Sequence, residues 1–157
     1  MDRNGICRAH CDGTAAPGAV IVDCGLHSGL AGDADVCRPT HVREDSRGSF
    51  IEIVNAGPWE TVVTGTMGAG AVLGHHYHKQ TLVFLFLISG RARVASVDVA
   101  TGRRRNTVLD AGKGIYLKPN SAHAIRFDQE STFILLKSRP YREDDPDTFA
   151  YDVEIGD

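Results

Sequence analysis

Histidines are concentrated near the middle of the chain, at positions 75, 76 and 78, and another follows at position 123. If residues 75–78 form a strand, His76 and His78 share one face, whereas His75 points to the other. A neutral imidazole is a ligand for Zn²⁺, Fe²⁺ or Ni²⁺, and it also exchanges protons near neutral pH. Because burying two imidazoles without a role is costly, His76 and His78 are predicted to be functional, whereas His75 is predicted to be an ordinary outward histidine.

The segments around these histidines have the composition of strands. Short runs rich in Val, Ile, Leu, Thr and Phe alternate with turn residues between Ser49 and Pro140, and glycines are too frequent there for helices. The runs are Phe50–Val54, Glu60–Thr66, Ala71–His78, Leu82–Ile88, Ala92–Val99, Asn106–Leu109, Gly114–Lys118, His123–Phe127 and Thr132–Lys137. This spacing predicts an antiparallel sandwich or barrel, in which the apolar Leu82–Ile88 is a central strand.

A barrel could also bring the distant His123 to the histidine pair. If Lys118 ends a strand and Pro119–Ala122 forms a turn, His123 opens the next strand of the same sheet. The lumen of a barrel is a place where His76, His78 and His123 can converge. Three imidazoles on one metal ion would leave coordination positions open for water and substrate.

Two motifs in these segments resemble those of the cupin superfamily. Gly70–His78 is similar to the G-x5-H-x-H half of the first cupin motif, and Gly90 lies where its final glycine belongs. Gly114–His123 is similar to the second motif, including Pro119. The resemblance implies an all-β, single-domain cupin, a double-stranded β-helix or jelly-roll barrel, over residues 46–157.

Within the cupins, the chain resembles the WxcM-like sugar-nucleotide 3,4-ketoisomerases, which act on dTDP-4-keto-6-deoxyglucose in deoxysugar biosynthesis. The likeness covers Glu44 to Phe149. Its motifs are Arg47–Glu52, His76–Lys79, Gly114–Pro119 and the segment Leu135–Asp145. Such an enzyme moves the keto group by proton transfer through an enediol and needs no metal cofactor.

The resemblance also implies roles for individual residues. His78 would be the base, His76 would hold or relay the proton, and Tyr116 would polarise the sugar. The candidates for contact with a negatively charged substrate are Arg47, Lys79, Arg126 and His123.

Two other functions stay open. Leu82 and Val83 stand where the metal-binding cupin motif has a Glu, which excludes a four-ligand site but not a metal held by His76, His78 and His123. Such a site, with Zn, Fe or Ni, would suit a cyclase, isomerase or dioxygenase acting on a hydrophobic keto or polyketide intermediate in natural-product biosynthesis. The third possibility is a barrel that binds small molecules without catalysis.

The composition limits the partners. The chain has 157 residues and a formal net charge of −3, which argue for one domain and against binding a nucleic-acid backbone. Its longest apolar run, Leu82–Ile88, is far shorter than the ~20 residues that span a bilayer. No secretory signal is visible, so a cytoplasmic protein with a small-molecule substrate is expected.

The two ends of the chain differ from the predicted barrel. Residues 1–45 are expected to form an extended arm that holds all four cysteines (Cys7, Cys11, Cys24 and Cys37) as thiols. Its strand-like run Ala19–Asp23 is predicted to pair with the sheet edge of a second copy, giving a homodimer. At the other end, the acidic Tyr141–Asp147 is expected to be solvated, and a last strand is predicted from Phe149 to Val153.

Overall fold

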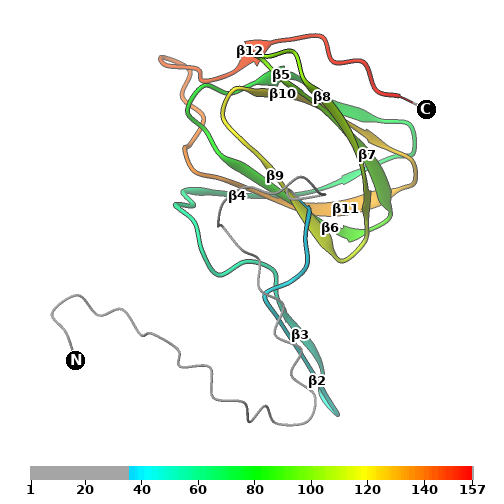
Figure 1. Ribbon diagram of the computed structural model, residues 1–157. Helices are drawn as coiled ribbons and strands as arrows, with labels where there is room; N and C mark the ends of the chain where they lie inside the picture. Colours follow the sequence, from blue (N-terminus) through cyan, green and yellow to red (C-terminus); the bar gives the residue numbers. More distant parts are fainter. Residues whose placement is uncertain (1–35, 157) are drawn as a thin grey trace, which may run out of the picture.

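The computed structural model describes residues 36–156, and within this range it is built from strands alone. Two five-stranded antiparallel sheets face each other and close into a jelly-roll barrel, viewed along its lumen in Figure 1. The described strands are β1 (Val36–Cys37), β2 (His41–Asp45), β3 (Gly48–Glu52), β4 (Thr61–Met67), β5 (Val72–Tyr77), β6 (Val83–Ser89), β7 (Arg91–Asp98), β8 (Arg104–Asp110), β9 (Lys113–Leu117), β10 (Ser121–Phe127), β11 (Ser131–Lys137) and β12 (Phe149–Ala150). The predicted all-β cupin fold is confirmed.

The order of the strands explains which of them are buried. One sheet has the order β1-β9-β6-β11-β4, and the other has the order β12-β5-β10-β7-β8. Strand β6 lies at the centre of the first sheet, and its residues from Val83 to Leu87 are all buried. The continuous apolar run therefore marks a strand that is covered on both faces, as predicted.

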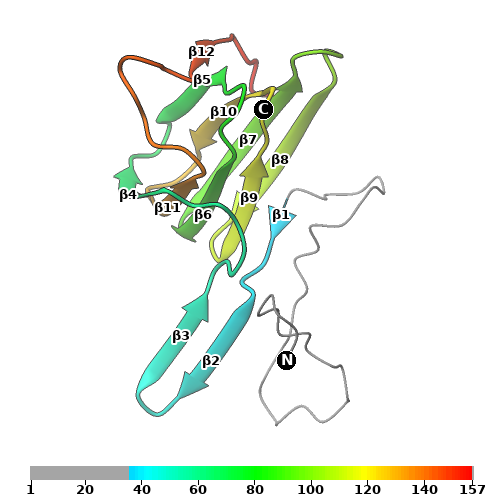
Figure 2. The same cartoon turned by 90° about the vertical axis from the view of Figure 1, so that its left-hand side faces the viewer.

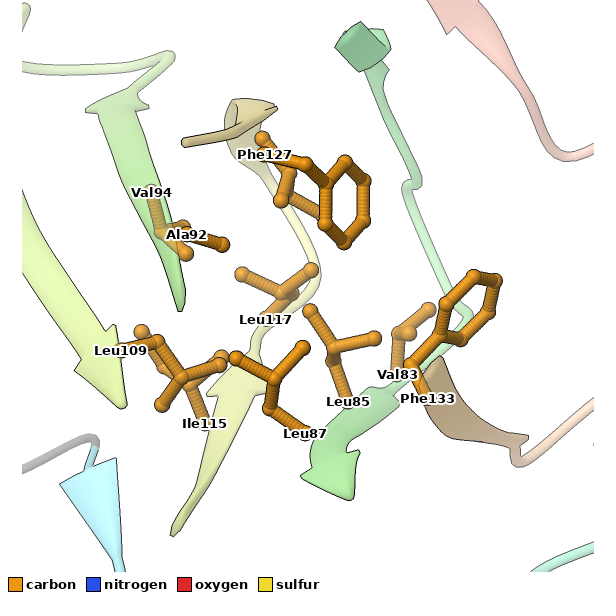
Figure 3. Close-up of a cluster of buried hydrophobic side chains, with 11 residues drawn as sticks. Val83, Leu85, Leu87, Ala92, Val94, Leu109, Ile115, Leu117, Phe127 and Phe133 are labelled. Carbon is orange, nitrogen blue, oxygen red and sulfur yellow. The ribbon is translucent and has the colours of Figure 1, made fainter. Parts of the chain in front are cut away.

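The main core fills the lumen between the two sheets. Figure 3 shows side chains from both sheets meeting there, including Leu85 and Leu87 of β6, Leu109 of β8 and Phe127 of β10. Each of these four is completely shielded from solvent. Because side chains alternate along a strand, β6 contributes every second residue from Val83 to Leu87 to this core.

A second apolar cluster covers the outer face of the first sheet. Phe84 and Phe86 point outward from β6 and pack with Trp59, Tyr116 and Cys37. Phe84 lies directly against Gly114, where a Cβ atom would come within 2.2 Å of the phenyl ring. Glycine is therefore needed at this position of β9 so that the aromatic ring can lie flat on the sheet.

The described part of the predicted arm is ordered into strands. Residues 36 and 37 pair with β9 and add an edge strand to the barrel. Strands β2 and β3 form a hairpin that projects away from the barrel, as Figure 2 shows. The strand-like run Ala19–Asp23, on which the expected homodimer depends, and Cys7, Cys11 and Cys24 lie outside the described residues, so those expectations stay predictions.

The C-terminal segment lies along the second sheet. Strand β12 pairs with β5, where Phe149 is opposite Tyr77. Val153 is buried against Ala122 and Ala124 on the outer face of β10. A strand is therefore present where the predicted last strand begins. No helix in residues 36–156 is long and apolar enough to cross a membrane.

Candidate active site

An irregularity in β5 turns two of the histidines toward the lumen. His76 pairs with His123 of β10, but the next pair is Gly74 with Ala124, so one extra residue is inserted at His75. His75 has a φ of 55° and Gly74 a φ of 103°. Leu73 and His76, three residues apart, consequently both line the lumen, which a regular strand would not allow. A Cβ atom on Gly74 would lie 2.5 Å from the carbonyl oxygen of His123, so the bulge requires glycine.

The three predicted histidines meet at one point. One ring nitrogen from each of His76, His78 and His123 lies within 4.8 Å of the other two. The ring centroids are 5.0 Å apart for His76 and His78 and 4.8 Å apart for His76 and His123. His78 and His123 are only 5% and 3% exposed. The expectation that a barrel gathers these rings is met.

The other ring nitrogen of each histidine is tied to the backbone. Nδ1 of His76 lies 3.1 Å from the carbonyl oxygen of Gly74, and Nδ1 of His123 lies 3.0 Å from that of Ser121. Nδ1 of His78 is hydrogen-bonded to the carbonyl oxygen of Asp147. A carbonyl oxygen can only accept, so in each ring Nδ1 must donate the hydrogen. A neutral ring then has a free lone pair on Nε2.

Burial keeps two of these rings neutral. Desolvation, followed by the neighbouring charges, lowers the pKa of His123 to about 4. Desolvation also lowers the pKa of His76, and repulsion from His78 adds to the effect. At neutral pH both rings therefore present a lone pair rather than a positive charge.

The histidines line a cavity of about 140 Å³ at one end of the lumen. Its remaining walls are mostly apolar, and its one cationic side chain outside the histidines is that of Lys137, at the end of β11. No carboxylate lines this cavity among the described residues. The full lining consists of Leu73, Gly74, His76, His78, Val83, Leu117, His123, Ile125, Leu135 and Lys137. The cavity can therefore accept protons from a substrate and hold a negative charge.

A family model described as the polysaccharide biosynthesis C-terminal domain matches residues 43–149, which include most of the barrel and all three histidines. The chain belongs to this family. No curated protein matches the sequence significantly.

Solved structures of similar fold include three bacterial and archaeal sugar enzymes or assembly proteins. The dTDP-4-dehydrorhamnose 3,5-epimerase of Sulfolobus tokodaii is 20% identical, with a TM-score of 0.60 over 69% of this chain and 72% of that chain. A 3,4-ketoisomerase of Helicobacter canadensis is 19% identical, with a TM-score of 0.62 over 73% and 87%. The capsular polysaccharide assembling protein CapF of Staphylococcus aureus is 20% identical, with a TM-score of 0.57 over 71% of this chain but only 34% of its own. These similarities establish the cupin fold.

Tyr116, which was predicted to polarise the sugar, lies on the other side of the sheet. Its ring stacks with Trp59 at 6.3 Å and packs on Phe84 at 4.7 Å. Its neighbours Ile115 and Leu117 face the lumen, so alternation along β9 directs Tyr116 outward. The expectation that Tyr116 contacts the substrate together with His76 and His78 is therefore wrong for the pocket of this chain.

The three cationic candidates also lie outside the cavity. Arg47 is 77% exposed in the β2–β3 turn, where it binds Asp45. The ammonium of Lys79 lies 4.2 Å from the centre of the Phe149 ring. Arg126 lies between Ile125 and Phe127, which both face the core, so its side chain points outward. None of the three lines the pocket with His123, the fourth predicted contact.

His75 is on the outside, as predicted. Its Nδ1 lies 3.4 Å from the carboxylate of Asp152 and accepts a long hydrogen bond from the backbone N–H of Val153. The hydrogen bond from Val153 ties the C-terminal segment to β5. His75 is therefore a structural residue on the surface opposite to the cavity.

The acidic segment Tyr141–Asp147 was expected to be solvated, and this expectation is wrong for Asp147. Its carboxylate accepts hydrogen bonds from the backbone N–H groups of Lys79, Gln80 and Thr81 and from the Thr81 hydroxyl. Burial raises the pKa of Asp147, but these hydrogen bonds outweigh burial and lower it to about 2. Since its backbone carbonyl also accepts the His78 Nδ1 hydrogen, Asp147 connects the tail to the site.

Proposed function

We propose that this chain is an isomerase that acts on a nucleotide-linked keto sugar by histidine-mediated proton transfer, in the manner of the dTDP-sugar 3,4-ketoisomerases. The structural neighbours, which include a 3,4-ketoisomerase and a dTDP-sugar 3,5-epimerase, support this reaction class. Both reactions move a proton at a carbon next to a carbonyl group. The family match, described by polysaccharide biosynthesis, agrees with a sugar substrate.

One observation supports the proposal most strongly: three imidazoles line one cavity, and the Nδ1 atom of each is held by the backbone, which leaves Nε2 free. A base for a carbon acid must be neutral, oriented and shielded from bulk water. His78 is the proposed base, since its ring is buried and its Nδ1–H would stay bonded to a carbonyl oxygen when Nε2 takes a proton. That bond would stabilise the imidazolium formed.

The other two histidines would assist. His76, whose ring lies beside that of His78, could relay the proton to the second carbon. His123, kept neutral by its low pKa, could accept a hydrogen bond from a sugar hydroxyl. The apolar walls would exclude water, so the enediol intermediate would not lose its proton to solvent.

The experiment uses dTDP-4-keto-6-deoxyglucose as the probe in deuterated water. Wild-type protein should place solvent deuterium on the sugar ring and form the 3-keto isomer, both detectable by NMR. His78→Ala should slow this exchange about 10²- to 10⁴-fold, the usual contribution of a general base. His75→Ala is the matched control, because it removes an imidazole three residues away in the chain that does not line the cavity. Wild-type protein that exchanges no deuterium would contradict the proposal for this substrate.

A metal-dependent reaction is the second candidate, and the convergence of one ring nitrogen from each of the three histidines favours it. The donor set suits Zn²⁺, Fe²⁺ or Ni²⁺, which would polarise a keto group or, for iron, support oxygen chemistry. The apolar walls would suit a hydrophobic keto substrate. Against it, the ammonium of Lys137 lines the same cavity and would repel a dication, and no carboxylate offsets that charge among the lining residues.

Elemental analysis of protein purified without added metal separates the candidates. If the reaction is metal-dependent, about one transition metal per chain should be found. A His76→Ala, His78→Ala double variant should lose this metal. If the chain is a metal-independent isomerase, no stoichiometric metal should be bound, and a chelator should leave deuterium exchange unchanged. Protein that neither exchanges deuterium nor retains metal would favour a binding function without catalysis.

A further inference from the structure

Lys137 is the one cationic side chain, apart from the histidines, that reaches the cavity from the described residues. It ends β11, where its backbone pairs with Val83 on one side and Thr61 on the other. The residue is half-buried, and it lines both the histidine cavity and a smaller adjoining one that Arg139 also lines. Lys137 therefore lies at the border between the closed site and the surface.

The ammonium of Lys137 has no partner among residues 36–156. No hydrogen bond, ion pair or ring contact engages its Nζ there, whereas Lys113 binds Asp110 and Lys79 lies on Phe149. Its charge is felt across the cavity, since repulsion from Lys137 contributes to the lowered pKa of both His76 and His123. A half-buried cation without a counterion is costly, so a negatively charged ligand group would be stabilised there.

The surroundings indicate which negative group fits. The walls next to Lys137 are the apolar side chains Val83, Leu117 and Leu135, which offer no additional donors for a diphosphate. A single oxygen that gains charge only during the reaction needs just one donor beside a base. The three imidazoles supply that base in the same cavity.

We propose that Lys137 is a further catalytic residue, which binds the carbonyl oxygen of the keto sugar and stabilises the enediolate formed from it. This role rests on the proposed isomerase function. The base takes the proton from the hydroxyl-bearing carbon, the electron pair of that C–H bond forms the C=C bond, and the carbonyl π pair moves to the oxygen held by Lys137. The hydroxyl then loses its proton and becomes the new carbonyl, while the C=C electron pair takes back the proton held by the base at the former carbonyl carbon. The proton lost by the hydroxyl passes to the former carbonyl oxygen, which becomes the new hydroxyl.

The first test replaces Lys137 in the full chain and follows deuterium exchange of dTDP-4-keto-6-deoxyglucose. Lys137→Met keeps much of the aliphatic stem and removes the charge, so kcat should fall about 10²- to 10³-fold while KM changes less than about threefold. Lys137→Arg should restore part of kcat. Lys113→Met is the matched control, since Lys113 lies in another part of the barrel, paired with Asp110. A rise in KM with unchanged kcat would overturn the proposal and indicate a phosphate contact instead.

A second test does not depend on turnover. The tropolone anion is a planar oxo-enolate, so it resembles an enediolate and serves as a probe for chelator-treated protein in calorimetry. Wild-type protein should bind it at least tenfold more tightly than Lys137→Met does. Equal affinities, or no binding to wild-type protein, would overturn the role of Lys137. Lys137-dependent binding of the anion by protein that exchanges no deuterium would support the oxyanion site and contradict only the isomerase.

Discussion

The two ends of the barrel lumen are built from the same strands but have opposite chemistry. On β10 the inward side chains run from Phe127 at one end to His123 at the other, and on β11 they run from Phe133 to Lys137. At the first end, large side chains fill the space between the sheets (Figure 3). At the second, histidines and a lysine surround a cavity. Inward positions four residues apart on one strand therefore belong to the packed core at one end and to the cavity at the other. The type of residue at each position determines whether it fills the lumen or lines the cavity.

The largest effect on stability is expected at the packed end. Phe127→Ala removes a fully buried ring from the core and should lower the free energy of unfolding by about 3–5 kcal/mol. The folded fraction should keep its deuterium exchange per molecule, because Phe127 does not line the cavity. Urea denaturation at neutral pH measures the first quantity, and NMR measures the second.

Val62→Ala is the control for this change, since Val62 is 71% exposed and should cost less than about 0.5 kcal/mol. A loss of exchange in folded Phe127→Ala protein would show that the two ends are not independent.

A smaller effect on stability is expected from pH at the histidine end. His123 has an ordinary pKa near 6.5 when unfolded but a pKa of about 4 in the fold, so the unfolded chain binds the proton more tightly. Above pH 6.5 the ring is neutral in both states, so His123 does not reduce the free energy of unfolding. As the pH falls from about 6.5 to 4, this free energy decreases by up to about 3 kcal/mol. His76 acts in the same direction because its pKa is also lowered.

Urea denaturation at pH 7, 5.5 and 4 tests this dependence, and His123→Gln should flatten it. The core variant Phe127→Ala should keep the same slope, because it leaves His123 in place. If His123→Gln leaves the pH dependence of the free energy of unfolding unchanged, groups other than His123 cause the decrease at low pH.

The sequence was informative about local pattern and much less so about contacts between distant segments. Alternating apolar residues and turn residues predicted nine of the strands close to their observed bounds, as with Leu82–Ile88 for β6 (Val83–Ser89). The histidine pair could be predicted because side chains two residues apart share one face of an extended segment. The bulge that turns His76 inward has a local sign in Gly74, but its exact place depends on the pairing with β10.

The errors and omissions have physical reasons. Gly114–Lys118 is apolar on both sides of Tyr116, so alternation alone could not say which face is the lumen. Lys137 ends an apolar strand and resembles an ordinary surface residue until the neighbouring strands place it in the cavity. Asp147 is 69 residues from His78, and no local pattern predicts that hydrogen bond.

The smallest expected effect concerns the contact between Asp147 and His78. Its removal tests whether the C-terminal segment orients the ring of His78. Asp147→Ala removes the acceptor of the backbone N–H groups at residues 79–81 and should lower the free energy of unfolding by about 1–2 kcal/mol. The backbone carbonyl that holds His78 remains but loses its anchor. Nitrogen-15 NMR should therefore show a smaller fraction of the Nδ1–H form of His78, and deuterium exchange should fall about tenfold.

Asp144→Ala is the matched control in the same acidic segment, because the carboxylate of Asp144 binds the exposed Arg142 on the surface. It should leave both the His78 tautomer and the exchange rate unchanged. Asp147→Asn keeps one acceptor oxygen and should fall between wild type and Asp147→Ala in both readouts. An Asp147→Ala protein that loses stability but keeps the wild-type tautomer would show that the ring of His78 is positioned by the barrel alone, since the tail would then support the fold without orienting the base.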